Sequence, residues 1–190
     1  MAQKHRCGWV GSDPLYQKYH DEEWGVPIRD DRKMFEFLLL ETFQAGLSWL
    51  TILKKRENFR KAFAGFDPEK VAKFSENDID KLLQNEGIIR YRLKIESAIN
   101  NAQRFLEVQK EFGTFCDYIW SFVDHEPIQN ARKNLSEVPA KTDRAERLSK
   151  DLKKRGFKFI GPTTVYAHMQ ASGMVNDHEM SCFRYDQLKS

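Results

Sequence analysis

The segment LLQNEGIIRYRLKI (residues 82–95) contains two apolar, helix-like repeats that are interrupted at Gly87. This pattern predicts a helix, a short break and a second helix rich in arginine and lysine. The first-turn N–H groups of the second helix would face outward, and their partial positive charge suits a phosphate. Arg90, Arg92 and Lys94 would add Coulomb attraction. A glycine between two helices is also typical of an ordinary helix–helix turn, so both interpretations stay open.

On both sides of this segment the sequence contains residues typical of helix starts and helix ends. Asp67 followed by Pro68 is an N-cap with proline at the first helical position, and Gly156 and Gly173 follow periodic segments as C-terminal glycines do. Strict alternation of apolar and polar residues is nearly absent, which predicts an all-α fold. The expected helices are 30–45, 49–64, 68–74, 76–85, 90–112, 115–124, 143–155 and 162–172, and the polar connector 124–143 is expected to be a surface loop.

Composition limits the class of protein. The 190 residues suffice for one domain with a core of its own, and no apolar run approaches the roughly 20 residues that cross a bilayer. The start, MAQKHRCGWV, has no apolar signal region, so we expect a cytoplasmic protein. A net charge of +3 permits nucleic-acid binding without requiring it. The basic, aromatic-containing stretches 53–61 and 152–159 fit either a DNA-contacting face or a solvated helix face.

One carboxylate lies on the apolar side of the predicted helix 30–45. At 100° per residue, Met34, Leu38 and Glu41 fall on one stripe, whereas Glu36 and Lys33 point away. A lone buried carboxylate costs several kcal/mol unless a donor or a cation balances it. Glu41 is therefore either a structural residue that caps a helix or pairs with an arginine, or a binding residue that awaits a ligand.

The sequence QAGLSW (44–49) closes the same helix with a tight turn. Leu47 would be exposed there, and such a turn can carry an apolar wedge that fills the gap left when a base leaves a duplex. Aromatic rings with a polar partner make the kind of pocket that receives such a base. In the alternative interpretation, Leu47 and Trp49 are core residues.

Two thiols and two imidazoles form a candidate metal site. His178 and Cys182 are four residues apart, and Cys7 and His20 could supply two more ligands from the N-terminal segment. Such a set makes a closed tetrahedral zinc site with a structural role, although the spacing is not that of a zinc finger. The alternative is two partly buried thiols and two solvent-exposed histidines. A metal would join the N-terminal segment 1–29 to the C-terminal segment 176–190, and residues of about 30–175 would form the helical core between them.

Taken together, these strings resemble the bacterial type I DNA-3-methyladenine glycosylases of the helix-hairpin-helix glycosylase superfamily. The resemblance covers nearly the whole chain, residues 1–190, as one glycosylase unit. The strings that carry it are RCGWV, DPLYQKYHDEEWGVP, QAGLSW, ILKKRENFR, FDPEKVA, GIIRYRLKI, LSKDLKKRGFKFIGPTT and MVNDH.

This resemblance implies hydrolytic excision of 3-methyladenine from double-stranded DNA, with the free base as product, by a monomer that needs no membrane. It implies structural zinc on Cys7, His20, His178 and Cys182. It also implies insertion of Gly46 and Leu47 into the duplex and contact of Gly87 to Arg92 with the phosphodiester backbone. The implied base pocket consists of Glu41, Tyr16, Tyr19, Trp24, Trp49 and Trp9.

Two departures from the family matter, at Thr42 with Phe43 and in the unfamiliar tail after Cys182. Thr42 and Phe43 stand where smaller or more polar residues are typical of the family, which affects the expected reach of the turn onto DNA. The aspartate that assists bond cleavage in the wider superfamily has no counterpart in RFLEVQKEFGTF (104–115), as in this family. Lys94 lies inside the second predicted helix, so we expect base removal without strand cutting. The alternatives are a non-catalytic helix-hairpin-helix nucleic-acid-binding module and a metal-dependent hydrolase that uses His178 and Cys182.

Overall fold

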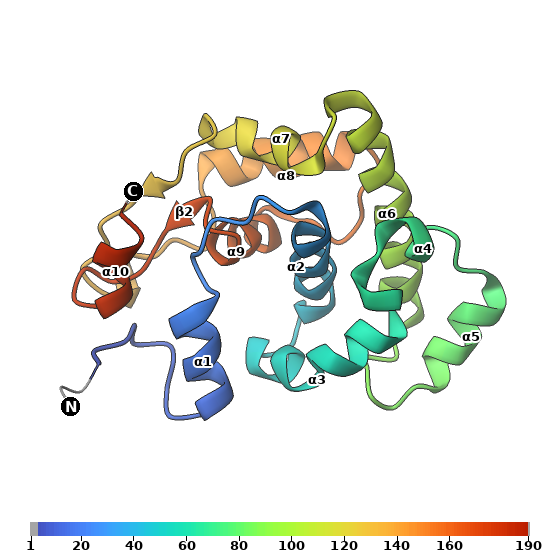
Figure 1. Cartoon of the computed structure of the whole chain (residues 1–190), viewed down its shortest axis with the longest axis horizontal. Coiled ribbons are helices and arrows are strands. Elements are labelled where there is room, and N and C mark those ends of the chain that lie inside the picture. The colour runs from blue at the N-terminus through green and yellow to red at the C-terminus, as the bar shows by residue number, and fades with distance from the viewer. Residues whose placement is uncertain (1–3, 190) are drawn as a thin grey trace.

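Within residues 4–189, the range that the computed structural model describes, the chain is mostly helical, as predicted (Figure 1). Two strands of two residues each, β1 (Ile128–Gln129) and β2 (Val175–Asn176), pair in parallel. The α-helices are α1 (Pro14–Glu22), α2 (Asp31–Gln44), α3 (Trp49–Ala62), α4 (Pro68–Val71), α5 (Glu76–Gln84), α6 (Arg92–Phe112), α7 (Phe115–Trp120), α8 (Asp143–Lys154), α9 (Pro162–Ala171) and α10 (Phe183–Gln187).

Two of these helices, α1 and α10, were not predicted. Helix α1 starts with Asp13 as N-cap and Pro14 at its first position, the same signature that was recognised at Asp67 and Pro68. Only Tyr19 and His20 are buried in α1, so it lacks the apolar stripe that reveals a helix in a sequence. The predicted helix 115–124 ends earlier as α7 and continues as a 3₁₀ turn over Ser121–Val123.

Helix α2 is the centre of the core and packs against α3, α6, α7 and α9 (Figure 1). All of its residues from Met34 to Phe43 are buried. The prediction that Glu36 points away from the core is therefore wrong. Its carboxylate is buried because Arg56 and Arg60 of α3 reach it, at N–O distances of 2.7 and 2.9 Å. A buried, paired carboxylate is tolerated where an unpaired one is costly.

Helices α5 and α6 form the predicted hairpin, but the break between them covers residues 85–91 rather than one glycine. The loop lies against α3, where a Cβ on Gly87 would come within 2.9 Å of the Asn58 side chain. Gly87 is thus required for close packing between the loop and α3. Arg92, the first residue of α6, pairs with Glu76, Asp80 and Glu96 at 2.6, 3.1 and 3.2 Å.

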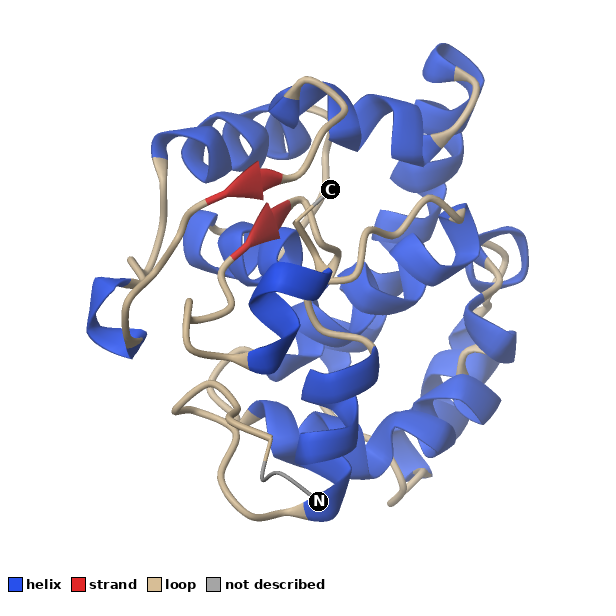
Figure 2. Ribbon diagram, turned by 60° about the vertical axis from the view of Figure 1, so that its left-hand side comes forward, coloured by secondary structure: helices blue, strands red, loops and turns tan. Residues whose placement is uncertain are grey.

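The connector 124–143 is not merely a surface loop, contrary to the prediction. Its strand β1 pairs with β2 of the C-terminal segment, which Figure 2 shows as the two adjacent arrows. The N-terminal segment reaches the same region, because the Phe183 N–H donates to the His5 carbonyl at 3.0 Å. Three parts of the chain that are distant in sequence therefore meet beside α9. None of the helices in the described range has the length and apolarity that a bilayer crossing needs.

A buried histidine should make stability depend on pH. His168 on α9 is 2% exposed, and burial lowers its pKa to about 4 from an unfolded value of 6.5. Between these values the unfolded chain binds a proton that the folded chain does not, so the free energy of unfolding falls as pH falls. We expect a loss of about 2 kcal/mol between pH 7 and pH 5 from this residue.

The measurement is urea unfolding at several pH values for the wild type and for His168→Gln. Comparing the two removes the contributions of all other titrating groups. The wild type should lose more stability than the variant on acidification. Parallel pH profiles would show that His168 is not the source.

Candidate functional site

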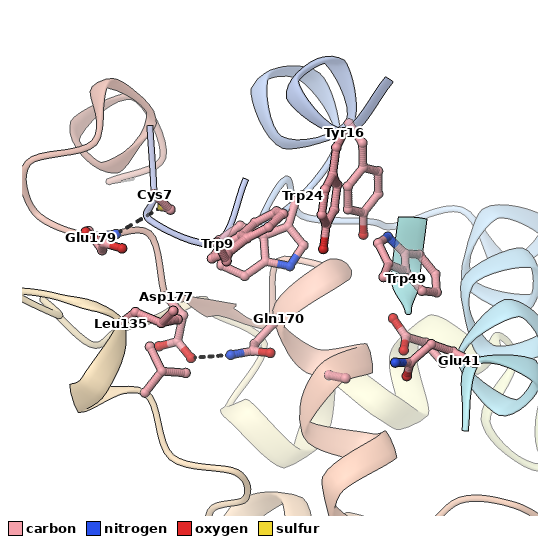
Figure 3. A pocket seen from close by; sticks show the side chains of 14 residues that line it. Cys7, Trp9, Tyr16, Trp24, Glu41, Trp49, Leu135, Gln170, Asp177 and Glu179 are labelled. Atoms are coloured by element: carbon pink, nitrogen blue, oxygen red, sulfur yellow. Dashed lines mark hydrogen bonds between the residues drawn. The ribbon is translucent and has the colours of Figure 1, made fainter. Parts of the chain in front are cut away.

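A cavity of about 230 Å³ opens where α1, α2, the start of α3, α9 and the C-terminal segment meet (Figure 3). Sites for drug-sized ligands have volumes of roughly 300–1,000 Å³, so this one suits a molecule of about the size of one nucleobase. The structure brings together in its walls all six residues that the family resemblance implied for the base pocket. These are Trp9, Tyr16, Tyr19, Trp24, Glu41 and Trp49.

Glu41 supplies the acid group of the cavity. It is 3% exposed, and no ion pair or hydrogen bond within residues 4–189 reaches its carboxyl group. Burial raises the pKa of Glu41 to about 8, so by itself the carboxyl group is mainly protonated at neutral pH. A cation that enters the cavity would favour the ionised form. Glu41 and Glu36 are thus both buried on α2, but only the carboxylate of Glu36 is paired with arginines.

Aromatic rings make up most of the wall. The centroid of Trp9 lies 5.0 Å from that of Tyr16 and 4.9 Å from that of Trp24, and Tyr19 and Trp49 are 5.7 Å apart. Burial, followed by the charge of Glu41, raises the pKa of both Tyr16 and Tyr19, so their hydroxyls stay protonated donors. Electron-rich ring faces around a carboxylate are suited to a flat cation.

Several wall residues were not found from the sequence. Gln170 on α9 donates its amide N–H to Asp177 Oδ2 at 2.9 Å, which leaves its carbonyl oxygen on the cavity side (Figure 3). Asp177 is itself buried and fixed by Asn130 and Arg132 at 2.7 and 3.3 Å. Nothing in the local pattern marks these residues, because tertiary pairing of the connector with the C-terminal segment places them. The other unpredicted wall residues are Cys7, Gln44, Leu135, Val138, Ala167 and Glu179.

Next to the cavity, the four predicted metal ligands form one buried cluster. The ligand atoms of Cys7, His20, His178 and Cys182 all lie within 4.8 Å of one another. Cys7 Sγ is 3.4 Å from His178 Nδ1, and Cys182 Sγ is 3.5 Å from His20 Nε2. The alternative of solvent-exposed histidines is excluded, because both histidines are fully buried.

The surroundings of these residues also fit a metal. His20 Nδ1 contacts Asp21 at 2.9 Å, and Arg6 holds that carboxylate with two hydrogen bonds of 2.9 and 2.8 Å. His178 Nε2 lies 3.0 Å from the carbonyl of Trp24. Metal-binding histidines typically donate their second ring N–H to a carboxylate or a carbonyl, which fixes the tautomer and turns the other nitrogen to the ion.

The two thiols receive further hydrogen bonds. The backbone N–H of Glu179 donates to Cys7 Sγ, and that of Arg184 donates to Cys182 Sγ, both at 3.4 Å. A hydrogen bond between the thiols lowers the pKa of Cys182 and raises that of Cys7, so Cys182 is the more readily ionised. The cluster can therefore hold a metal ion with four protein ligands.

The cluster and the cavity share a wall. The Trp24 ring is 4.6 Å from the ring of His178, and Trp9 is 5.3 Å from that of His20. Cys7 lines the cavity directly. A loss of order in the cluster would therefore also displace the aromatic side chains of the cavity wall.

The turn after α2 leads out of the cavity. Ala45 has φ −50° and ψ 119°, and Gly46 has φ +81°, which together define a type II turn that needs glycine at its third position. The Leu47 N–H donates to the Gln44 carbonyl at 2.7 Å, and Leu47 is 37% exposed. Thr42 and Phe43 are fully buried, so they do not extend the reach of the turn.

The charged residues of the hairpin differ from the prediction in one case. Arg90 is half-exposed, and its nearest carboxylate, on Glu86, is 4.0 Å away. Lys94 was expected to add positive charge that faces a phosphate, but it is buried, and its ammonium binds backbone carbonyls instead. The reason is the close packing of the first turn of α6 on the end of α2.

Comparison with known proteins agrees with this geometry. The family model described as methyladenine glycosylase matches residues 9–185. The chain is 53% identical over 180 residues to DNA-3-methyladenine glycosylase 1 of Escherichia coli K12, covering 95% of this chain and 96% of the relative.

Two solved structures are also similar. One is a 3-methyladenine DNA glycosylase I with a TM-score of 0.92 and 52% identity, which covers 94% of this chain and 98% of the other. The second, from Staphylococcus aureus, is described as the structural basis of 3-methyladenine recognition. It has a TM-score of 0.91 and 42% identity, with 94% and 95% covered. The match extends from Trp9 in the cavity wall to the helix after Cys182, so the chain belongs to the methyladenine glycosylase family.

Proposed function

We propose that the protein flips 3-methyladenine out of alkylated double-stranded DNA and hydrolyses its bond to the sugar, which leaves an abasic site. The relatives reported above act as 3-methyladenine glycosylases, and the cavity offers what that base needs. The observation that carries the proposal is the position of Glu41. A buried carboxyl group that has no partner among residues 4–189 faces an aromatic cavity of the right size.

The chemistry of the lesion fits this site. Methylation at N3 makes the adenine cationic, and this weakens the glycosidic bond because the base can leave as a neutral molecule. Aromatic faces attract such a cation by about 1–2 kcal/mol when water is excluded. Glu41 can accept a hydrogen bond from the exocyclic amino group. Neutral adenine gains less from both contacts, so the cavity selects the damaged base.

The negative charge of Glu41 limits how much this residue can accelerate cleavage of the glycosidic bond. A carboxylate that stabilises the cationic base most strongly before it leaves would slow bond breaking, because only preferential stabilisation of the transition state accelerates it. We infer that Glu41 chiefly selects and orients the base. DNA phosphates then balance the positive charge that develops on the sugar, and a positioned water attacks.

The DNA contacts follow from the two exposed turns. Gly46 and Leu47 would enter the gap that the flipped base leaves, since Leu47 is exposed beside the cavity. The hairpin from Gly87 to Arg92 would bind the phosphodiester backbone through the first-turn N–H groups of α6, with Arg90 facing solvent. Arg92 is shared with three carboxylates of the hairpin, so its contribution to DNA binding is smaller than its charge indicates.

We propose that the cluster of Cys7, His20, His178 and Cys182 binds structural zinc. The donor set of two thiolates and two imidazoles fills a tetrahedral coordination shell, and an ion held there ties the two terminal segments together. Four protein ligands leave no open position, which disfavours a metal-dependent hydrolase. We further infer that residues 1–190 act as one monomeric unit of the helix-hairpin-helix glycosylase type, in the cytoplasm where the DNA is.

One assay tests the proposed function. The protein is incubated with methylated duplex DNA, and the released bases are separated and identified. We expect free 3-methyladenine and abasic sites without strand breaks, because the Lys94 ammonium is occupied by two carbonyls. Unmethylated duplex is the control. Tight DNA binding without base release would instead indicate a non-catalytic nucleic-acid-binding module.

A further inference from the structure

Lys94 joins the hairpin to the wedge turn, defined here as residues 44–47. It lies in the first turn of α6 and is 6% exposed. Its Nζ donates to the carbonyl of Phe43 at 2.8 Å and to that of Ala45 at 2.8 Å. These two carbonyls are at the C-terminal end of α2, immediately before Gly46 and Leu47.

The end of α2 has no cap of its own. No basic residue lies in its last turn, and Ala45, its C-cap, has an extended ψ of 119°. Gly46 has a positive φ of +81° but belongs to the type II turn, whose hydrogen bond runs from the Leu47 N–H to the Gln44 carbonyl and leaves the carbonyls of Phe43 and Ala45 to other donors. A helix C-terminus carries partial negative charge on its free carbonyls, and an ammonium group is well suited to satisfy them. Lys94 therefore acts as a C-cap supplied by another helix.

Interactions within α6 do not favour a buried lysine at position 94. A cation at the N-terminus of a helix opposes the helix dipole, and burying a lysine costs desolvation energy. Leu93, next to it, is 52% exposed, so an apolar side chain is tolerated at the surface of this turn while the lysine is buried. The position of Lys94 is favourable only in relation to the end of α2.

On the basis of the proposed function, we propose that Lys94 is a positioning residue that fixes the wedge turn relative to the hairpin. When the hairpin binds the DNA backbone, the distance from the phosphates to Leu47 is then set by a rigid contact. The insertion of Leu47 thus occurs at a fixed depth opposite the cavity. Lys94 itself touches neither the base nor the DNA.

This role predicts a loss that depends on the substrate. In Lys94→Met the two carbonyls lose their donors and the wedge turn becomes mobile, and misplacement by about 1 Å can cost about 100-fold in rate. We expect single-turnover excision of 3-methyladenine to fall 10- to 100-fold in duplex DNA. Excision from the same sequence as a single strand should fall less than about threefold, because no base pair has to be opened there.

The experiment compares four proteins: wild type, Lys94→Met, Leu47→Ala and the double variant. If Lys94 acts through the wedge, the two losses on duplex DNA will not add, and binding of free 3-methyladenine will stay unchanged in Lys94→Met. Lys110→Met, on the exposed last turn of the same helix, is the control and should resemble the wild type. Lys94→Gln, which keeps an N–H donor for one carbonyl, replaces Lys94→Met if that variant does not fold.

Equal losses on single- and double-stranded substrates, or additive losses in the double variant, would overturn the proposal and leave Lys94 a general structural residue. A wild type that releases no 3-methyladenine from either substrate would refute the proposed function instead. The two failures are therefore distinguishable.

Discussion

Glu41→Gln should weaken binding of free 3-methyladenine and lower kcat/KM for its excision by similar factors, about 10- to 100-fold each. Glutamine keeps a carbonyl acceptor but loses the negative charge, and a hydrogen bond to a charged group is worth about 1.5–3 kcal/mol. The measurements are equilibrium binding of the free base and single-turnover excision from methylated duplex. A selection role requires that affinity and rate fall together.

Helix α2 offers a matched control. Glu36→Gln changes the same residue type in an equally buried position, but it breaks the pairs with Arg56 and Arg60 rather than a contact to the base. It should lower the free energy of unfolding and leave binding of the free base unchanged. Intact binding in Glu41→Gln together with a collapsed rate would refute the selection role and assign Glu41 to the chemical step.

The pH dependence checks the same assignment. The pKa of Glu41 is about 8, so at pH 7 only a minor part of the protein without bound base carries the ionised carboxylate, the form that attracts the cationic base most strongly. For the wild type, kcat/KM should rise with pH up to about 8. In Glu41→Gln this rise should be absent, because glutamine does not titrate.

Cys182→Ser should abolish zinc binding and destabilise the whole protein. Removing one of four ligands opens the coordination shell, and structural zinc sites contribute folding free energy directly. We expect a loss of about 5 kcal/mol or more in the free energy of unfolding, which is comparable with the total stability of many domains. Elemental analysis and thermal unfolding measure the two effects.

Binding of free 3-methyladenine should be lost as well, because Trp9 and Trp24 pack on the ligand histidines. The third cysteine is the control. Cys116 is buried on α7, away from the cluster, and Cys116→Ser should keep the zinc and the binding of the base. Full activity and stability of Cys182→Ser without zinc would remove the metal from the proposed function.

Much of the fold could be predicted because its main helices carry local signals. Apolar periodicity and caps such as Asp67 with Pro68 place helices to within a few residues. Helix α1 was missed because it buries only Tyr19 and His20, and the strands were missed because two residues cannot show alternation. Local pattern fails where an element is held by distant contacts.

The residues of the site also divide into those with a local sequence signal and those placed by distant contacts. Glu41 was found because it breaks an apolar stripe, which is a local signal. The burial of Glu36 could not be predicted in this way, because its arginine partners lie 20 and 24 residues away on another helix. Gln170 and Asp177 have no sequence signature, and only pairing of the connector with the C-terminal segment brings them to the cavity.

The contact between the N-terminal and C-terminal segments determines when the site can form during synthesis. His178 leaves the ribosome 171 residues after Cys7. The cavity needs both, because Cys7 lines its wall and the ring of Trp24 packs on His178. A nascent chain therefore carries Glu41 and the N-terminal aromatic residues without a closed site until His178 has emerged. The enzyme gains the ability to hold a base only after the segment with His178 and Cys182 has left the ribosome, and a nascent chain without that segment cannot excise bases.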